Sequence, residues 1–218
     1  MKTLVLTGSS GKAGQAIVRD LVEDYEVVTV DLLGSPAGQV KTKVHYKADL
    51  TDLGQCYDVL RGADMLVHMA NIPAPGIFSE GRTFNENISM NYNLFQAAID
   101  LKLERVVWAS SETTLGLPFD TPPGYAPVDE AHFPFPESSY ALSKVLTEQM
   151  AEQFNRWSGI PFVGLRFSNI LNADVYRTFP ESCWQDVRAR KWNLWGYIDE
   201  EDVAQSCRRG LEADIEDG

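Results

Sequence analysis

The strongest constraint on the fold is an alternation of short apolar runs with longer segments of helical periodicity, which continues along most of the chain. Runs of aliphatic and β-branched residues predict strands, and apolar residues that recur every three or four positions predict amphipathic helices. Because consecutive parallel strands need a crossover of about a dozen residues, usually a helix, the alternation predicts an α/β fold built on a parallel sheet. The expected strands are Lys2–Leu6, Glu26–Val30, Val44–Lys47, Met65–Met69, Arg105–Ala109 and Phe162–Arg166.

Capping residues and breakers refine this outline. Thr51 or Asp52 could cap the second helix, and Ser138 or Ser139 the fourth, because short polar side chains accept hydrogen bonds from the first turn. The proline-rich stretch Leu117–Pro136 predicts a long irregular loop. The expected helices are one after Gly14, one ending near Arg61, and Phe84–Leu101, Tyr140–Arg156 and Glu201–Glu212.

Composition narrows the class of partner. The chain has 218 residues and a net charge of −12, which argues against nucleic acid and anionic membranes because both are bound by clustered lysine and arginine. Its length favours one domain, or one domain plus a small lobe. No apolar stretch approaches the roughly 18 residues of a membrane span. The three separated cysteines, Cys56, Cys183 and Cys207, favour reduced thiols over a disulfide framework. We therefore expect a cytoplasmic protein.

No metal site is predicted. His68 lies in the middle of an apolar run and is interpreted as a core histidine. His45 and His132 have no carboxylate or cysteine at a spacing suited to metal binding.

Three glycines follow the first expected strand and precede the first expected helix. Gly8, Gly11 and Gly14 have the spacing of a phosphate-binding turn, in which the backbone approaches a pyrophosphate at a helix N-terminus. Asp31, at the end of the second strand, stands where an acid can accept hydrogen bonds from a ribose and repel a 2′-phosphate. This favours NAD over NADP, although Lys12 in the loop could soften the preference. A purely structural glycine turn and a solvated strand-end Asp31 remain the alternatives.

A second group of polar residues indicates acid–base chemistry. Tyr140 and Lys144 lie four residues apart, on one face of an expected helix. A nearby lysine and a positively charged nicotinamide ring would favour the phenolate, although free tyrosine has a pKa of about 10. Ser110 and Ser111 follow an expected strand at its carboxyl end, where α/β sheets gather ligands. An ordinary helical Tyr–Lys pair is the alternative for the pentapeptide alone.

Ten short motifs occur in register with one family, the extended short-chain dehydrogenases/reductases, usually called the NAD-dependent epimerase/dehydratase family, which the chain resembles. The motifs are T-G-S-S-G-K-A-G (Thr7–Gly14), Asp31, Asp49-Leu50, D-M-L-V-H-M-A-N (Asp64–Asn71), Met90-Asn91, S-S-E-T-T-L-G (Ser110–Gly116), P-V-D-E (Pro127–Glu130), Y-A-L-S-K (Tyr140–Lys144), L-R-F-S-N (Leu165–Asn169) and Y-I-D-E-E-D-V-A (Tyr197–Ala204).

The resemblance implies a role for each matching position. Ser111, Tyr140 and Lys144 would be catalytic, with Tyr140 transferring a proton while a hydride passes between substrate and nicotinamide. The resemblance implies that Ser111 and Asn169 contact substrate. Glu112, which departs from the dehydratase motif, is a further candidate for substrate contact or for a second acid/base because it lies next to Ser111. The residues implied to bind NAD are Gly8, Gly11, Lys12, Ala13, Gly14, Asp31, Asp49, Leu50, Met69, Ala70, Tyr140 and Lys144.

The resemblance also implies an architecture: a doubly wound, Rossmann-like parallel sheet in residues 1–168, and a small substrate lobe in residues 169–218 with a helix returning to the main domain. Compared with the family pattern, the C-terminal portion that usually completes this lobe is expected to be missing or very short. Leu115 stands where many members carry tyrosine, and Glu112-Thr113 differ from the dehydratase motif. Within the family, the sequence resembles the uronate dehydrogenase branch more than the epimerase branch.

Three functions follow as hypotheses. The first is an NAD-dependent oxidoreductase acting on a sugar, sugar acid or similar hydroxyl or carbonyl compound. The second is an NAD-dependent epimerase, including one for nucleotide sugars, with no net redox change. The third is a non-catalytic NAD-binding regulatory module. By analogy with the family, a homodimer would form through the helices Phe84–Leu101 and Tyr140–Arg156.

Overall fold

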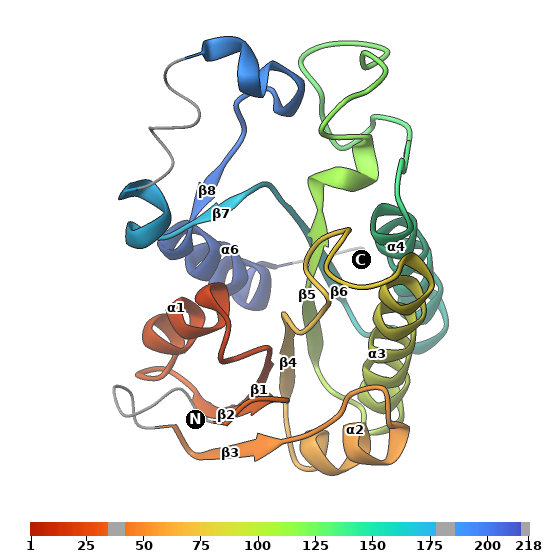
Figure 1. Cartoon of the computed structure of the whole chain (residues 1–218). Coiled ribbons are helices and arrows are strands. Elements are labelled where there is room, and N and C mark those ends of the chain that lie inside the picture. Colours follow the sequence, from red (N-terminus) through yellow and green to blue (C-terminus); the bar gives the residue numbers. More distant parts are fainter. Residues whose placement is uncertain (35–41, 178–185, 215–218) are drawn as a thin grey trace.

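A computed structural model describes residues 1–34, 42–177 and 186–214 (Figure 1). Cys183 and most of the expected loop Gly34–Gly38 lie outside the described residues. The main-sheet strands are β1 (Thr3–Thr7), β2 (Glu26–Asp31), β3 (Val44–Lys47), β4 (Met65–His68), β5 (Arg105–Ser111) and β6 (Phe162–Phe167). The helices are α1 (Lys12–Leu21), α2 (Leu53–Leu60), α3 (Glu80–Asp100), α4 (Ser139–Ser158), α6 (Glu200–Glu212) and the 3₁₀ segments η1 (Glu112–Leu115) and η2 (Val187–Asn193).

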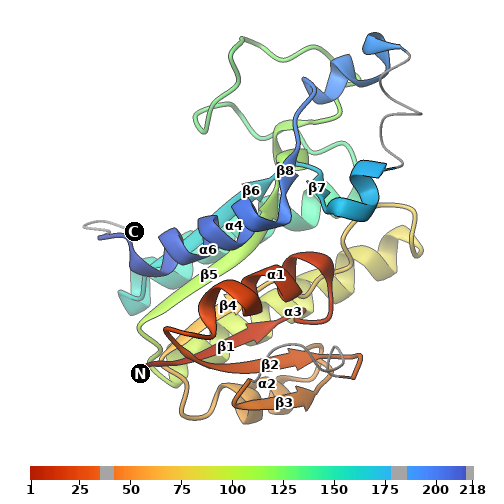
Figure 2. The ribbon, with the colours of Figure 1, turned by 90° about the vertical axis from the view of Figure 1, so that its left-hand side faces the viewer.

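The six strands form one parallel sheet in the order β3-β2-β1-β4-β5-β6. The order runs outward in two directions from the centre, because β2 and β3 lie to one side of β1 and β4 to β6 lie to the other. All six strands end at the same edge, so the segments that follow them meet there (Figures 1 and 2). The predicted doubly wound parallel sheet is confirmed.

Helices cover both faces of the sheet and give it two apolar cores. On one face, α1 and α6 pack through residues such as Ile17 and Val203. On the other face, α2, α3 and α4 contribute Leu60, Phe95 and Phe154. Strands covered on both faces read as continuous apolar runs, which is why the strand pattern was clear in the sequence.

The helix ends resolve two open choices. Asp52 caps α2 by accepting from the backbone N–H of Gln55, and Ser138 caps α4 by accepting from that of Ala141. The expected start of the third helix at Phe84 is wrong, because α3 begins at Glu80. The strand β5 continues two residues beyond its expected end, so that both serines lie within it.

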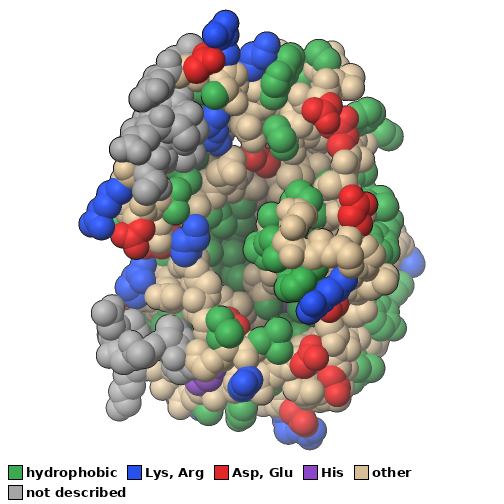
Figure 3. Space-filling model, in the orientation of Figure 1, with side chains coloured by type: hydrophobic (Ala, Val, Ile, Leu, Met, Phe, Trp, Pro, Cys, Tyr) green, Lys and Arg blue, Asp and Glu red, His purple; other side chains and the backbone are tan. Residues whose placement is uncertain are grey.

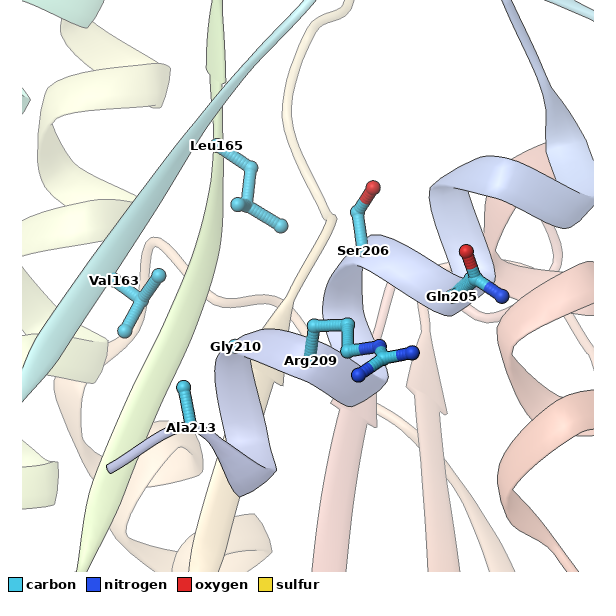
Figure 4. A pocket seen from close by; sticks show the side chains of 7 residues that line it. All are labelled: Val163, Leu165, Gln205, Ser206, Arg209, Gly210 and Ala213. Atoms are coloured by element: carbon cyan, nitrogen blue, oxygen red, sulfur yellow. The ribbon is translucent and has the colours of Figure 1, made fainter. Parts of the chain in front are cut away.

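The C-terminal segment adds a small parallel sheet of β7 (Ile170–Leu171) and β8 (Ile198–Asp199), which the sequence pattern did not predict. From β8 the chain returns through α6, whose Arg208 binds Asp20 and Asp24 near the end of α1 at 2.8 Å each. A shallow depression between β6 and α6 is lined by Val163, Leu165, Gln205, Ser206, Arg209, Gly210 and Ala213 (Figure 4). Among the described residues, no helix is both long enough and apolar enough to cross a membrane.

Candidate active site

The carboxyl-end edge of the sheet brings the predicted site residues together. The glycine loop follows β1, Asp31 ends β2, and Ser111 ends β5. The molecular face shown in Figure 3 is hollowed near its centre, with apolar side chains on the floor of the hollow. In open α/β sheets, ligands bind outside the strand ends where the strand order reverses, which here is between β1 and β4.

Two glycines of the loop are required by close backbone contacts. A Cβ at Gly14 would lie 2.2 Å from the carbonyl oxygen of Gly8. A Cβ at Gly8, which has a φ of +69°, would lie 2.6 Å from the nitrogen of Ala70. The helix α1 then begins at Lys12 without a side-chain cap on its first N–H groups. This tight turn with open N–H donors fits a pyrophosphate, as the glycine spacing predicts.

Asp31 is tied to the glycine loop. Its Oδ2 accepts from the backbone N–H of Ser10 at 2.9 Å, and its Oδ1 accepts from that of Leu33 at 3.0 Å. A carboxylate has about four lone-pair positions, so two bonds leave room for the hydroxyls of a ribose. The geometry fits NAD.

The other positions implied to contact cofactor follow β3 and β4. Asp49 is exposed, but its carboxylate accepts from the N–H and hydroxyl of Thr51. The Leu50 side chain is buried in the core, so its side chain cannot line an open site. Met69 and Ala70 are half-buried against Gly8. Lys12 is exposed and Ala13 half-buried at the start of α1.

The three predicted catalytic side chains converge where β5 ends and α4 begins. The residual exposed fractions are 7% for Ser111, 7% for Tyr140 and 1% for Lys144. Tyr140 and Ser111 share a hydrogen bond. The Nζ of Lys144 donates to the carbonyl oxygen of Ala109 at 2.6 Å and lies 5.7 Å from the centre of the Tyr140 ring. The phenol of Tyr140, the hydroxyl of Ser111 and the amine of Lys144 thus lie together at the carboxyl-end edge of the sheet, where the glycine loop also lies.

Burial is the main cause of the pKa shifts of Tyr140 and Lys144. Burial raises the pKa of Tyr140 and the nearby Glu112 raises it further, while the hydrogen bond with Ser111 lowers it. Burial also lowers the pKa of Lys144 to about 7, against the opposing effect of Glu148. The phenol therefore stays protonated in the cofactor-free protein, and the phenolate expected from Lys144 together with a positively charged nicotinamide ring stays a prediction.

Glu112 connects the catalytic strand to the C-terminal segment. Its Oε1 lies 3.4 Å from the amide Nδ2 of Asn169, and its pKa is raised mainly by burial. The side chains of Ser168 and Asn193, and the charge of Arg190, oppose that shift. Glu112 and Asn169, both predicted to contact substrate, therefore lie together.

His68 occupies the core position expected of it. It is fully buried, and its Nδ1 lies 2.7 Å from the hydroxyl of Thr7. Burial and the nearby Lys144 lower its pKa to about 3, so it is neutral. Among the described residues, no group of three His, Cys, Asp or Glu side chains is placed to hold a metal ion.

Sequence reasoning missed two residues beside the catalytic group, Glu148 and Arg166. The carboxylate of Glu148 accepts from the hydroxyl of Ser110 at 2.5 Å and binds Arg166 through two hydrogen bonds of 2.9 and 2.8 Å. The one available signal was the spacing of Glu148, four residues after Lys144 and eight after Tyr140, which places all three on one helix face.

Similarity to known proteins agrees with the fold. The chain is 26% identical to an L-arabinose 1-dehydrogenase (NAD(P)(+)) of Haloferax volcanii, over 100% of this chain and 85% of that protein. It is 27% identical to a uronate dehydrogenase of Pseudomonas putida, over 95% and 70%. It is 29% identical to a UDP-glucose 4-epimerase of Streptococcus mutans, over 79% of this chain and 53% of that protein.

Solved structures share the architecture. A short-chain dehydrogenase/reductase superfamily protein from Agrobacterium tumefaciens, with bound NAD, matches 99% of this chain and 75% of its own with a TM-score of 0.79 and 21% identity. The model of the NAD-dependent epimerase/dehydratase family matches residues 4–196. The chain therefore belongs to the NAD-dependent epimerase/dehydratase family, and it is an enzyme whose cofactor is NAD.

Proposed function

We propose that this protein is an NAD-dependent oxidoreductase that oxidises a hydroxyl of a sugar or sugar acid, or reduces the corresponding carbonyl. The observation that carries the proposal is the convergence of Ser111, Tyr140 and Lys144 at the sheet edge that also presents the glycine loop. A phenol hydrogen-bonded to an alcohol, with an amine beside it, is suited to moving one proton at a substrate oxygen.

Residues of the glycine loop would hold the cofactor. The backbone around Gly8, Gly11 and Gly14 would accommodate the pyrophosphate, with Lys12 and Ala13 at the helix start, and Asp31 would bind the adenosine ribose. Asp49 and Leu50, after β3, would lie beside the adenine, Leu50 through its backbone. Met69 and Ala70, after β4, would flank the ribose and phosphates. When bound, NAD supplies the hydride acceptor, or NADH the donor.

The catalytic residues would divide the proton chemistry among them. Ser111 would donate a hydrogen bond to the reacting substrate oxygen and hold it near the phenol. Tyr140 would act as the acid when it is protonated, which is its state in the cofactor-free protein. For oxidation it must act as the base, so its pKa has to fall when the positively charged cofactor ring binds. Lys144 would bind the nicotinamide ribose and add positive charge.

The substrate is proposed to be small. Residues 1–168 would bind the dinucleotide, while the segment 169–218 would form a small substrate lobe. Glu112 and Asn169 would contact hydroxyl groups of the substrate, because a carboxylate and an amide together accept and donate hydrogen bonds. The names of the relatives from Haloferax volcanii and Pseudomonas putida support an aldose or uronic acid.

Epimerisation is the second candidate. It is favoured by the similarity to the Streptococcus mutans UDP-glucose 4-epimerase, although the chain spans 53% of that protein's length. An epimerase would keep its cofactor bound during turnover and would convert one sugar stereoisomer into another without accumulating NADH.

We also propose that the protein forms a homodimer through α3 and α4. An apolar groove between these helices is lined by Phe84, Ile88, Tyr92, Leu146, Gln149, Met150, Gln153, Phe154 and Trp157. The side chain of Trp157 is 56% exposed, and Tyr92 and Leu146 are also exposed. A second copy would bury this patch by forming a four-helix bundle.

A screen of NAD reduction tests the proposed function. Purified protein is mixed with NAD and a panel of aldoses, uronic acids and polyols, and NADH absorbance is followed. The proposal expects NADH with at least one member of the panel. In a parallel arm, UDP-glucose is incubated with the protein and its stereoisomer is sought by chromatography. A new stereoisomer without NADH would replace the oxidoreductase by the epimerase, and no turnover in either arm would contradict both.

A further inference from the structure

We propose that Glu148 is a positioning residue of the active site, which holds Lys144 and the end of β5 in place through a network with Ser110 and Arg166. The proposal rests on the proposed function, because it assigns Lys144 and Ser111 to the chemistry. Glu148 itself would not touch substrate or cofactor, since protein groups take three of its roughly four acceptor positions.

The network joins three elements at one carboxylate. Glu148 lies on α4, Ser110 on β5 and Arg166 on β6. The Glu148 side chain is 16% exposed and that of Arg166 is 25% exposed. The paired, planar geometry of an arginine–carboxylate contact fixes orientation as well as distance. Such a partly buried, two-point contact is directional in a way that an exposed ion pair is not.

Three successive residues of β5 meet three successive turns of α4. Ser111 hydrogen-bonds with Tyr140, the carbonyl of Ala109 accepts from Lys144, and Ser110 donates to Glu148. Tyr140, Lys144 and Glu148 are spaced by four residues each, so they lie one above another on one helix face. The Glu148 contact is therefore the third point of attachment between the catalytic helix and the catalytic strand.

Removing the contact between Glu148 and Ser110 would weaken the other two contacts between α4 and β5, those of Tyr140 with Ser111 and of Lys144 with Ala109. Without Glu148, the hydroxyl of Ser110 and the guanidinium of Arg166 lose their shared acceptor, and the strand end that carries Ser111 loses a restraint. Displacements of about 1 Å in positioning groups can cost about 100-fold in rate. Glu148 would thus affect the reaction rate without contacting the reactants.

Glu148 also bears on the charge of Lys144. Its carboxylate is the group that opposes the effect of burial on the Lys144 pKa. Replacing it with an uncharged amide removes that opposition and leaves the Arg166 guanidinium without its counter-charge, so both changes disfavour the ammonium. The titratable or charged groups of this region are Tyr140 and Glu148 on α4 and neutral His68 on β4, together with Arg166 on β6, which binds Glu148, and Glu112 on η1, which acts on Tyr140.

The test compares Glu148→Gln with Glu152→Gln, the same chemical change one turn further along α4 at an exposed position. The first readout is the titration midpoint of Lys144 in the cofactor-free protein, followed by NMR of its side-chain carbon next to the amine. We expect Glu148→Gln to lower the midpoint by about one pH unit or more and Glu152→Gln to leave it unchanged. Equal midpoints in both variants and wild type would overturn the proposal.

The second readout is steady-state kinetics with whichever substrate the screen identifies. Glu148→Gln should lower kcat by about 10-fold or more and displace the pH profile of kcat, whereas Glu152→Gln should match the wild type. Ser110→Ala, which removes only a hydroxyl, should lower kcat without moving the titration midpoint of Lys144. This variant tests the positioning role if Glu148→Gln does not fold. Wild-type kinetics in Ser110→Ala would overturn the positioning role. Because the NMR titration needs no turnover, an inactive wild type would refute the proposed function separately.

Discussion

The cost of burying Lys144 leads to a prediction about stability. Lys144 is 1% exposed, and its ammonium donates a hydrogen bond to the carbonyl oxygen of Ala109. Lys144→Met replaces the ammonium by an unbranched apolar side chain of similar length. We expect the variant to be inactive and yet more stable than the wild type at neutral pH, because the buried charge is removed.

The magnitude follows from the pKa. Burial lowers the pKa of Lys144 from 10.5 to about 7, and each unit corresponds to about 1.4 kcal/mol, so protonation costs the folded state roughly 4–5 kcal/mol at pH 7. Losing the hydrogen bond to Ala109 offsets about 1–3 kcal/mol of this gain. The net stabilisation is about 2 kcal/mol, which raises Tm by about 4–8 °C for a chain of this length.

The pH dependence distinguishes this cause from better packing. Between pH 7 and pH 10 the unfolded lysine keeps its proton while the folded one has released it, so the stability of the wild type rises with pH. The advantage of Lys144→Met should therefore shrink by about 1.4 kcal/mol per pH unit over that window and stay constant below pH 7. Urea unfolding at several pH values measures it, with Lys47→Met at an exposed position as control. An advantage that does not change with pH would refute the reasoning.

Two further predictions concern cofactor and assembly. Asp31→Ser should weaken NAD binding by about 10-fold or more and raise the relative affinity for NADP; calorimetry with both nucleotides measures this, and an unchanged NAD affinity would exclude Asp31 from the ribose site. Leu146→Glu should yield a monomer in sedimentation experiments where the wild type is a dimer, because it places a charge in the apolar groove of α3 and α4. Leu53→Glu on α2 is the control, and a dimer that survives Leu146→Glu would move the interface elsewhere.

The sheet and the meeting of the site residues could be predicted from the sequence for one reason. A parallel sheet buried on both faces shows its strands as apolar runs, and its strands all end at one edge. Ser111 lies 97 residues after Gly14 in the sequence. The glycine loop nevertheless follows the strand β1 of that sheet, and Ser111 is the last residue of its strand β5. Strand ends alone therefore place them at a common edge.

Other features could not be predicted because they leave no periodic signal. The contact of Glu148 with Arg166 joins two polar residues 18 positions apart on different elements. The strands β7 and β8 have two residues each, which is too short for an alternation to be visible. Burial raises the pKa of Tyr140, and the spacing of Tyr140 and Lys144 in the sequence gives no sign of that burial.

The central claim is that Tyr140 moves the proton in an NAD-linked reaction, and Tyr140→Phe tests it most directly. The substitution removes only the hydroxyl from a ring that stays buried, so NAD affinity measured by calorimetry should remain within about twofold of the wild type, a change of less than 0.5 kcal/mol. The rate of NADH formation with the identified sugar substrate should fall by about 10²–10⁴-fold. Undiminished NADH formation by Tyr140→Phe would contradict the account.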